Sequence, residues 1–366
     1  MVNRMGCMIY PCPSGRFGGM VEGLILAPVG GIVNRFAMKD RMLGITATVP
    51  SEVALAAGRA LVDLNNALVR GEDPEKAVRE AEAAGFPRNS CAWIKGVYAT
   101  ARRLGLAEIV GVSRGDCSNT EALLEILADD GLAAVPFAYP EDRSPEELRR
   151  ALARFADNLG TDLAEAERWR ERLVPIRKDL DQLDGLVVSG KRRDAAYFNL
   201  ALSASDWDGD LDAYASGLAR ELASGEEPPP AAVRLAYLGV PPAFTDLLPR
   251  TAELGATFVF AEIPRRFTMP GRPPDLVAQY LAYTYPYGMA FRLGDILPEL
   301  ERRRVDGVVH YVQSFCFRQI EDILLRRRVE LPVLTLEGDR PGPLAARDLL
   351  RLESFVEALL LRRGGG

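Results

Sequence analysis

Apolar and polar positions divide the chain into two regions in which short apolar runs alternate with helical patterns. In the first region, runs rich in Val, Ile and Leu predict strands, and stretches with helical spacing of apolar residues follow them. Short strands that alternate with helices are typical of a parallel, doubly wound sheet. The strands expected here are 43–48, 108–112 and 132–138, a further apolar run ends at Asp63, and the expected helices are 52–60, 74–84, 91–104 and 120–129.

The second region repeats this alternation nearer the C-terminus. Its strands are again short and apolar, and its helices carry charged faces. The expected strands are 233–238, 257–262, 305–312 and 332–336, and the expected helices are 244–254, 276–283, 318–327 and 344–361. The pattern therefore predicts a second parallel sheet.

A helical segment separates the two regions. Residues 144 to about 223 have an almost continuous helical pattern, which opens on Ser144 as a cap and Pro145 at the first helical position. The polar, proline-rich stretch 225–230 then reads as a linker. We expect an α/β fold of two doubly wound parallel-sheet domains with a helical middle segment. The expected divisions are an atypical N-terminal extension (1–42), an N-terminal α/β domain with the helical segment (43–225) and a C-terminal α/β domain (226–366).

Composition and charge exclude some classes of function. Apolar residues make up 48% and charged residues 26% of the 366 residues, as in a globular protein. The net charge is −6 and the arginine-rich pieces look like solvated helix faces, which disfavours nucleic-acid binding. The early apolar run 24–33 is too short to span a membrane and is broken by proline and glycine. We therefore expect a cytoplasmic protein with no membrane partner.

Three of the five cysteines stand at the predicted starts of helices. Cys117 and Cys316 each follow a predicted strand, at the carboxyl edge where doubly wound sheets bind ligands. Cys91 also opens a helix. Free N–H groups and the helix dipole are expected to lower the pKa of such thiols and to favour an anionic cluster. Cys7 and Cys12 lie in the extension and read as surplus to this group.

The spacing of the three cysteines argues against zinc. Structural zinc takes four ligands, usually in close pairs, whereas Cys91, Cys117 and Cys316 are far apart in the sequence. Three thiolates on a [4Fe–4S] cluster would leave one iron open to substrate, water or a bridging sulfide. Spacing alone leaves open the alternative that each cysteine is a small buried apolar residue. Ser118, Asn119, Gln313 and Ser314 flank the cysteines and would either donate to the cluster or substrate, or cap helices.

Three other patterns suggest rival chemistries. Ser113 lies in a G-x-S-x-G stretch, but the next helix is expected too late for a hydrolase nucleophile, and the single histidine, His310, lies within a predicted strand. Stretch 185–191 approaches a phosphate loop, but Arg192 replaces the magnesium-binding hydroxyl, so a helix boundary is favoured. Stretch 206–212 lacks the spacing of a calcium loop and is expected to be a solvated loop that caps the next helix.

A series of short segments in a fixed order resembles a known family. The segments are Gly44-Ile-Thr-Ala-Thr-Val-Pro-Ser-Glu52, Asp63-Leu-Asn-Asn66, Ser90-Cys91-Ala-Trp93, Ser113-Arg-Gly-Asp-Cys117-Ser-Asn-Thr120, Tyr237-Leu-Gly-Val-Pro-Pro242, Tyr283-Thr-Tyr-Pro-Tyr287, 306–316 and Pro332-Val-Leu-Thr-Leu-Glu-Gly-Asp339. Together they make the chain similar to the 2-hydroxyacyl-CoA dehydratase family, D-component type, which includes benzoyl-CoA reductase subunits and double-cubane-cluster reductases. The similarity covers roughly residues 43–359.

This resemblance implies a function. In the family, each subunit supplies three cysteines to a cluster, from the segments that here hold Cys91, Cys117 and Cys316. An ATP-hydrolysing iron–sulfur activator delivers an electron, and the cluster passes it to an acyl-CoA to give a ketyl radical. ATP is then handled only by that activator, and a homologous subunit completes a homo- or heterodimer. Two alternatives stay open: an ATP-dependent double-cubane [8Fe–9S] reductase of small molecules, and a non-catalytic electron-relay subunit.

Overall fold

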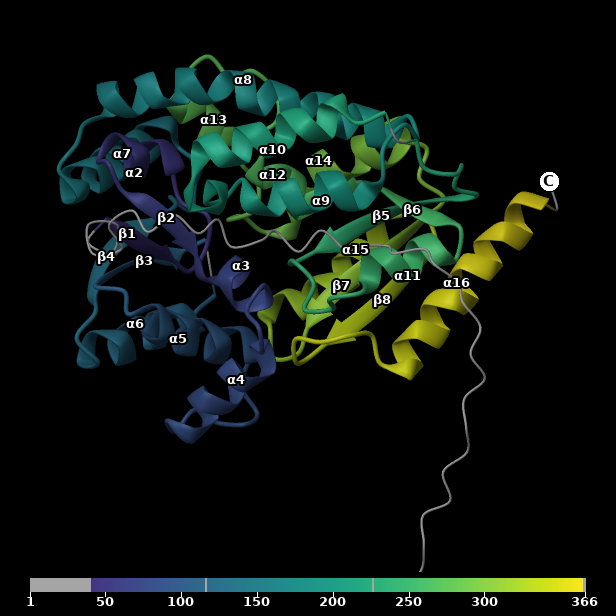
Figure 1. The fold of residues 1–366 in the computed structure, drawn as a ribbon, viewed down its shortest axis with the longest axis horizontal. Coiled ribbons are helices and arrows are strands. Elements are labelled where there is room, and N and C mark those ends of the chain that lie inside the picture. The colour runs from purple at the N-terminus through teal and green to yellow at the C-terminus, as the bar shows by residue number, and fades with distance from the viewer. Residues whose placement is uncertain (1–40, 116, 226, 365–366) are drawn as a thin grey trace, which may run out of the picture.

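The computed structural model describes residues 41–115, 117–225 and 227–364, and its core is two four-stranded sheets that are parallel throughout (Figure 1). The first has the order β2-β1-β3-β4, from β1 (Met42–Ile45), β2 (Ala60–Asp63), β3 (Glu108–Arg114) and β4 (Ala133–Ala138). The second has the order β6-β5-β7-β8, from β5 (Val233–Gly239), β6 (Ala256–Ala261), β7 (Gly307–Gln313) and β8 (Val333–Gly338). The predicted α/β class with two parallel sheets is confirmed.

Helices cover both faces of the first sheet. Successive side chains of a strand point to opposite faces, so Ile109 of β3 enters one core and Val110 the other. Both faces of these strands must therefore be apolar, as buried parallel strands require. The apolar core on one face includes residues of α3 (Leu64–Val69), α4 (Pro74–Ala83), α5 (Ala92–Leu104) and α6 (Asn119–Asp129), and the core on the other includes residues of α2 (Ser51–Ala56), α7 (Pro145–Leu159), α8 (Leu163–Val188) and α13 (Leu276–Ala282).

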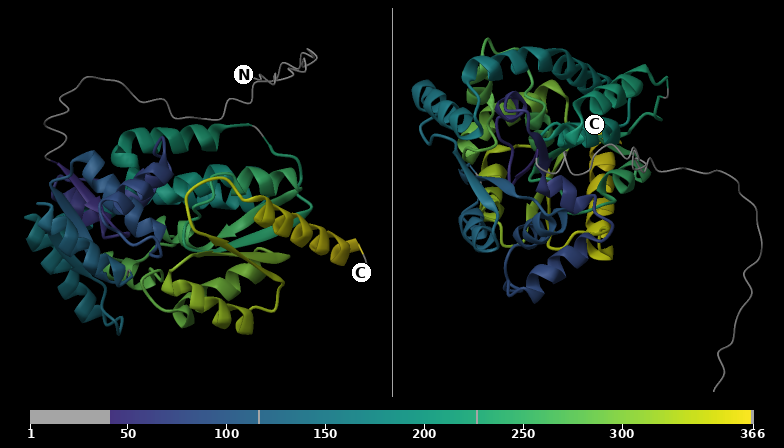
Figure 2. Two further views of the ribbon diagram at one scale, coloured as in Figure 1. Left: turned by 90° about the horizontal axis from the view of Figure 1, so that it is seen from below. Right: turned by 60° about the vertical axis from the view of Figure 1, so that its left-hand side comes forward.

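The second sheet is covered in the same way. Val308 and Val309 of β7 enter opposite cores. One face packs against α14 (Met289–Arg302) and α15 (Asp322–Arg328), and the other against α9 (Asp194–Ser203), α11 (Leu247–Glu253) and α16 (Ala346–Gly364). Helix α16 lies on the outside of this sheet, away from the first one (Figures 1 and 2). The remaining elements are α10 (Leu211–Ala223), α12 (Glu262–Phe267) and the 3-10 helices η1 (Trp207–Gly209) and η2 (Phe317–Glu321).

The long helix α8 and helix α10 run above both sheets (Figure 1). Each sheet also has residues in its core that come from the other side of the linker 225–230. Tyr280 and Tyr283 follow the linker in sequence but belong to the core of the first sheet. In the opposite direction, Asp194 of α9 accepts a hydrogen bond from the backbone N–H of Phe258 in the second sheet, at 2.7 Å. These exchanges tie the two sheets together.

Local residue choices explain where several helices begin and end. Ser144 caps α7 through the backbone N–H of Glu147, with Pro145 at the first position, as its sequence predicts. Asp162 caps α8 in the same way. Helix α5 ends at Gly105, whose φ of 60° is the left-handed conformation that glycine adopts without strain.

Some elements differ from expectation. The helix expected over 52–60 ends at Ala56, because Gly58 takes a φ of 67° and Ala60–Asp63 then pairs with β1 as strand β2. Helices α3, α12 and α14 have no counterpart in the predicted elements. Helix α8 ends at Val188, which agrees with a helix boundary in 185–191. Cys7 and Cys12 lie outside the described residues. Within the described ranges, none of the helices combines the length and apolarity needed to cross a bilayer.

Candidate iron–sulfur site

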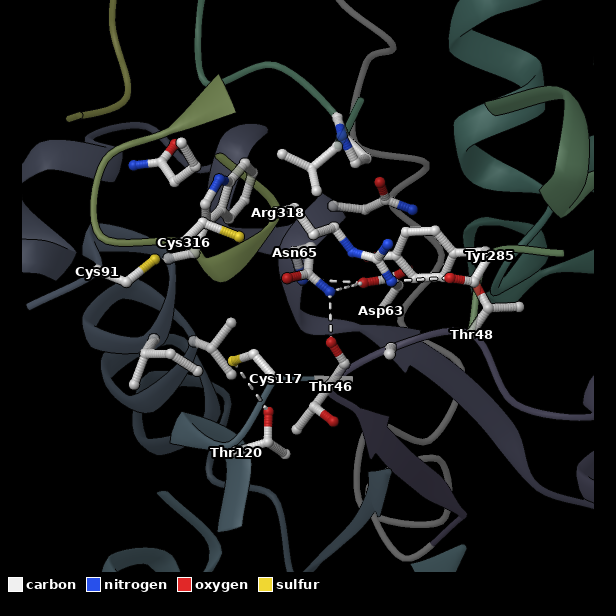
Figure 3. Close-up of a pocket in the computed structure, with 18 of the residues that line it drawn as sticks. Thr46, Thr48, Asp63, Asn65, Cys91, Cys117, Thr120, Tyr285, Cys316 and Arg318 are labelled. Atoms are coloured by element: carbon white, nitrogen blue, oxygen red, sulfur yellow. Dashed lines mark hydrogen bonds between the residues drawn. The ribbon is translucent and has the colours of Figure 1, made fainter. Parts of the chain in front are cut away.

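Cys91, Cys117 and Cys316 line a single cavity of about 100 Å³ (Figure 3). Cys91 is the N-cap residue of α5, and Cys117 lies in the turn between the end of β3 and the start of α6. Cys316 follows β7 and immediately precedes η2. The carboxyl ends of strands from both sheets therefore meet here, which is where open parallel sheets place ligands.

The thiol of Cys91 is the most deeply buried of the three. Only 6% of the residue is exposed. Burial raises the pKa of Cys91 to about 12, the backbone N–H groups of Trp93 and Ile94 lower it, and the neighbouring Cys316 and Cys117 raise it further. The expectation that a helix start lowers this pKa is therefore wrong in its net result. The N–H groups act as expected, but the loss of solvation outweighs them.

A second group of side chains forms the opposite part of the cavity wall. Arg318, the second residue of η2, is buried and its guanidinium lies over the ring of Tyr285 at 4.7 Å (Figure 3). Its Nη2 donates to the backbone carbonyl of Tyr285 at 2.8 Å. Glu321 lies 3.5 Å from Nη1 and is shared with Arg292. The cavity thus has thiols at one end and a fixed guanidinium at the other.

Polar residues that follow β1 and β2 complete this wall. The side chain of Asn65 donates to the backbone carbonyl of Thr46 at 2.9 Å and to Asp63 at 2.8 Å. The other oxygen of Asp63 accepts from Ser205 at 2.7 Å. Thr48 also lines the cavity, and its hydroxyl is buried.

The four residues expected to assist the cysteines do not all reach the cavity. Gln313 lines it, is buried, accepts from the hydroxyl of Tyr311 and donates to the backbone carbonyl of Asp339. Ser118 and Asn119 are exposed at the start of α6, and Ser314 donates to Glu337; none of these three belongs to the lining. Ser118 stands at the N-cap position without a side-chain capping bond.

The residues that suggested a hydrolase or a calcium loop have ordinary structural roles. Ser113 lies within β3, which continues to Arg114, so a helix does not start on this serine. His310 is buried in β7 and its Nδ1 lies 2.7 Å from a carboxylate oxygen of Asp322. In stretch 206–212, Asp210 caps α10 as expected. The expectation of a solvated loop is wrong for Asp206, which is buried against the backbone N–H of Asp63, and burial raises its pKa to about 7.

The arrangement of the three cysteines bears on which kind of metal group they would fit. Nowhere in 41–115, 117–225 or 227–364 do three Cys, His, Asp or Glu side chains lie close enough to hold one metal ion. The cavity of about 100 Å³, in contrast, has room for several heavy atoms, since one water needs about 10–15 Å³. Three thiols around such a space suit a cluster of several atoms better than a single ion.

Sequence reasoning did not single out Arg318, Thr48 or Asp63 as site residues. Asp63 and Thr48 do fall within segments that carry the family resemblance, which was the available signal. Arg318 carried none, because its neighbours in the sequence look like an ordinary basic helix face.

Comparison with known proteins gives a family for the chain. The search among curated proteins returned no match. A profile of the family described as 2-hydroxyglutaryl-CoA dehydratase, D-component, matches residues 46–359. This range holds all three cysteines of the cavity and every strand of the two sheets except β1. The chain therefore belongs to the 2-hydroxyglutaryl-CoA dehydratase D-component family.

Proposed function

We propose that Cys91, Cys117 and Cys316 bind a [4Fe–4S] cluster, and that the chain is the iron–sulfur subunit of a 2-hydroxyacyl-CoA dehydratase-like enzyme. The observation that carries the proposal is the convergence of three thiols, from segments far apart in the sequence, on one cavity. Membership of the dehydratase family supports the same function independently.

The residues present fit such a group. Thiolates are the usual ligands of iron–sulfur clusters, and a cluster occupies more space than one ion. Binding iron would take the proton from Cys91, and burial has raised the pKa of this thiol, so metal uptake should release protons. The N–H groups of Trp93 and Ile94 that face its sulfur would then stabilise the thiolate.

The bound cluster would supply single electrons to an acyl-CoA. The chain's own residues would position the acyl end and exclude water. Val240, Pro241 and Phe267 give the cavity apolar walls, and Gln313 is held by two hydrogen bonds at its edge. An ATP-hydrolysing iron–sulfur activator would deliver the electron, and a homologous subunit would complete the enzyme. Both partners are inferred from the family.

Anaerobic expression and reconstitution test the proposal. The wild-type chain should hold about four iron and four sulfide ions, and Cys91→Ser, Cys117→Ser and Cys316→Ser should each lower this content. A variant with both Cys7→Ser and Cys12→Ser is the matched control and should keep it. Dehydration of 2-hydroxyglutaryl-CoA with an added activator would establish the enzyme class. Equal iron in all variants would contradict the ligand assignment, and an excess of sulfide over iron would favour the double-cubane alternative.

A further inference from the structure

The end of the cavity opposite the thiols is built to hold an oxygen atom that carries negative charge. We propose that Arg318 and Thr48 form a binding subsite for a carboxylate or strongly polarised carbonyl oxygen of the substrate. The subsite rests on the proposed function only in that it treats the occupant of the cavity as a substrate.

Arg318 is fixed in place rather than mobile. Its guanidinium lies over the ring of Tyr285, 4.7 Å from the centroid, and 5.1 Å from the centroid of the Phe317 ring. The hydrogen bond from Nη2 to the Tyr285 carbonyl fixes its orientation. A guanidinium held in this way recognises a planar oxygen pair with little loss of side-chain entropy.

The ion pair that Arg318 makes is a loose one. Glu321 lies 3.5 Å from Nη1 of Arg318 and also pairs with Arg292, which in turn holds the buried Glu262. The two arginines and the two carboxylates balance in charge, but both carboxylates make their closer contacts with Arg292, which leaves Nη1 of Arg318 available to a ligand oxygen. Arg318 is 7% exposed, so water does little to screen its charge.

Thr48 supplies a second donor in the same cavity. It is 4% exposed, and its hydroxyl and that of Tyr283 interact with each other but make no other hydrogen bond among the described residues. Two hydroxyls bring two protons, and a bond between them would use only one. A buried hydroxyl proton without an acceptor costs about 1–3 kcal/mol. A ligand oxygen that accepts a hydrogen bond from this pair would remove that cost.

Asp63 brings a carboxylate to the same wall as Arg318 and Thr48 (Figure 3). Its carboxylate lines the same cavity and accepts from Asn65 and Ser205, which are neutral donors. An anion should therefore lie toward Arg318 and be repelled by Asp63. This predicts that neutralising Asp63 strengthens binding, whereas neutralising Arg318 abolishes it.

Saturation-transfer NMR on the full chain, before and after anaerobic cluster reconstitution, tests the subsite with acetate as the probe and acetamide as its neutral counterpart. The wild-type chain should bind acetate at least about tenfold more tightly than acetamide. Arg318→Gln and Thr48→Val should weaken acetate binding by about tenfold or more. Arg318→Lys should weaken it less than Arg318→Gln, because it keeps the charge but loses the planar fork. Thr48→Ser should retain most of the binding, and Asp63→Asn, which can still cap α3, should strengthen it. Thermal unfolding identifies any variant that fails to fold.

Equal binding of acetate and acetamide, absence of acetate binding to the wild-type chain, or unchanged binding in a folded Arg318→Gln or Thr48→Val variant would each overturn the subsite. The iron content measured on the same samples separates the two proposals. A chain that binds acetate as described but takes up no iron supports the subsite and contradicts the cluster. A chain that takes up iron but does not distinguish acetate from acetamide supports the cluster and overturns the subsite.

Discussion

Replacing Arg177 by methionine should destabilise the protein in a way that depends strongly on pH. Arg177 of α8 pairs with Glu52, the fully buried second residue of α2. Gln279 and the hydroxyl of Tyr280 also donate to this carboxylate, each at 2.7 Å. Burial raises the pKa of Glu52, but Arg177 and these two donors outweigh it, so the pKa lies below 4.5. The network fixes the chain just after Thr48.

The magnitude follows from two limits. Leaving a buried charge without its partner costs about 3–5 kcal/mol. Protonating Glu52 instead costs about 3.4 kcal/mol at pH 7, since its ordinary pKa is 4.5 and each pH unit is worth about 1.36 kcal/mol. The cheaper route sets the loss, so Arg177→Met should lower the free energy of unfolding by about 3 kcal/mol at pH 7. At pH 5 the protonation route costs only about 0.7 kcal/mol.

Urea unfolding of the variant and of the wild-type chain at pH 7 and pH 5 measures this difference. The deficit should shrink by about 2–3 kcal/mol between the two pH values. Without Arg177 the buried Glu52 has a raised pKa in the folded variant, so the variant gains stability relative to the wild-type chain as pH falls. The double variant Glu52→Gln with Arg177→Met is the control, and its deficit should not change with pH. A deficit in Arg177→Met that is below about 1 kcal/mol, or that is the same at both pH values, would refute the reasoning.

Two further predictions concern stability. A Cβ at Gly239, where φ is 99°, would come 2.2 Å from the carbonyl oxygen of Tyr311, so Gly239→Ala should cost at least about 2 kcal/mol, whereas Gly185→Ala in α8, with open space around it, should gain about 0.5–1 kcal/mol. Calorimetric unfolding of both variants checks this, and equal effects would contradict it. Burial raises the pKa of Glu299, but Arg302 and Arg303 outweigh it and hold that pKa at about 2. The stability that the ionised Glu299 contributes is present above pH 4.5 and is lost as pH falls toward 2. Urea unfolding should therefore show Glu299→Gln to be less stable than the wild-type chain at neutral pH, with a difference that fades in acid. A difference that does not change with pH would contradict this.

The sheets could be predicted from the sequence because buried parallel strands leave a strong pattern. Residues 307–313 are all buried and, apart from His310 and Gln313, apolar. Strand β2 was harder to predict, because it has only four residues and follows α2 closely. The turn at Gly58 separates the two elements. Helix α14 contains Pro298 and charged residues on its exposed face, which weakened its signal.

The site was predictable only in part, for a physical reason. Helix starts and strand ends are local features, so the positions of Cys91, Cys117 and Cys316 could be anticipated from sequence. What surrounds them depends on tertiary packing. Arg318 becomes a wall of the cavity because Tyr285, from another segment, packs beneath it, and no local pattern encodes that contact. Burial likewise decides the pKa of Cys91 against the effect of the helix start.

Mössbauer spectroscopy of the anaerobically reconstituted chain, enriched in ⁵⁷Fe, tests the central claim most directly. Three protein thiolates on a four-iron cluster leave one iron with a different ligand. The wild-type spectrum should therefore contain a cuboidal cluster in which one iron site differs from the other three, and Cys91→Ser should lose or alter that spectrum. A spectrum of four equivalent sulfur-ligated irons, or a chain that takes up no iron, would contradict the assignment of Cys91, Cys117 and Cys316 as the three ligands.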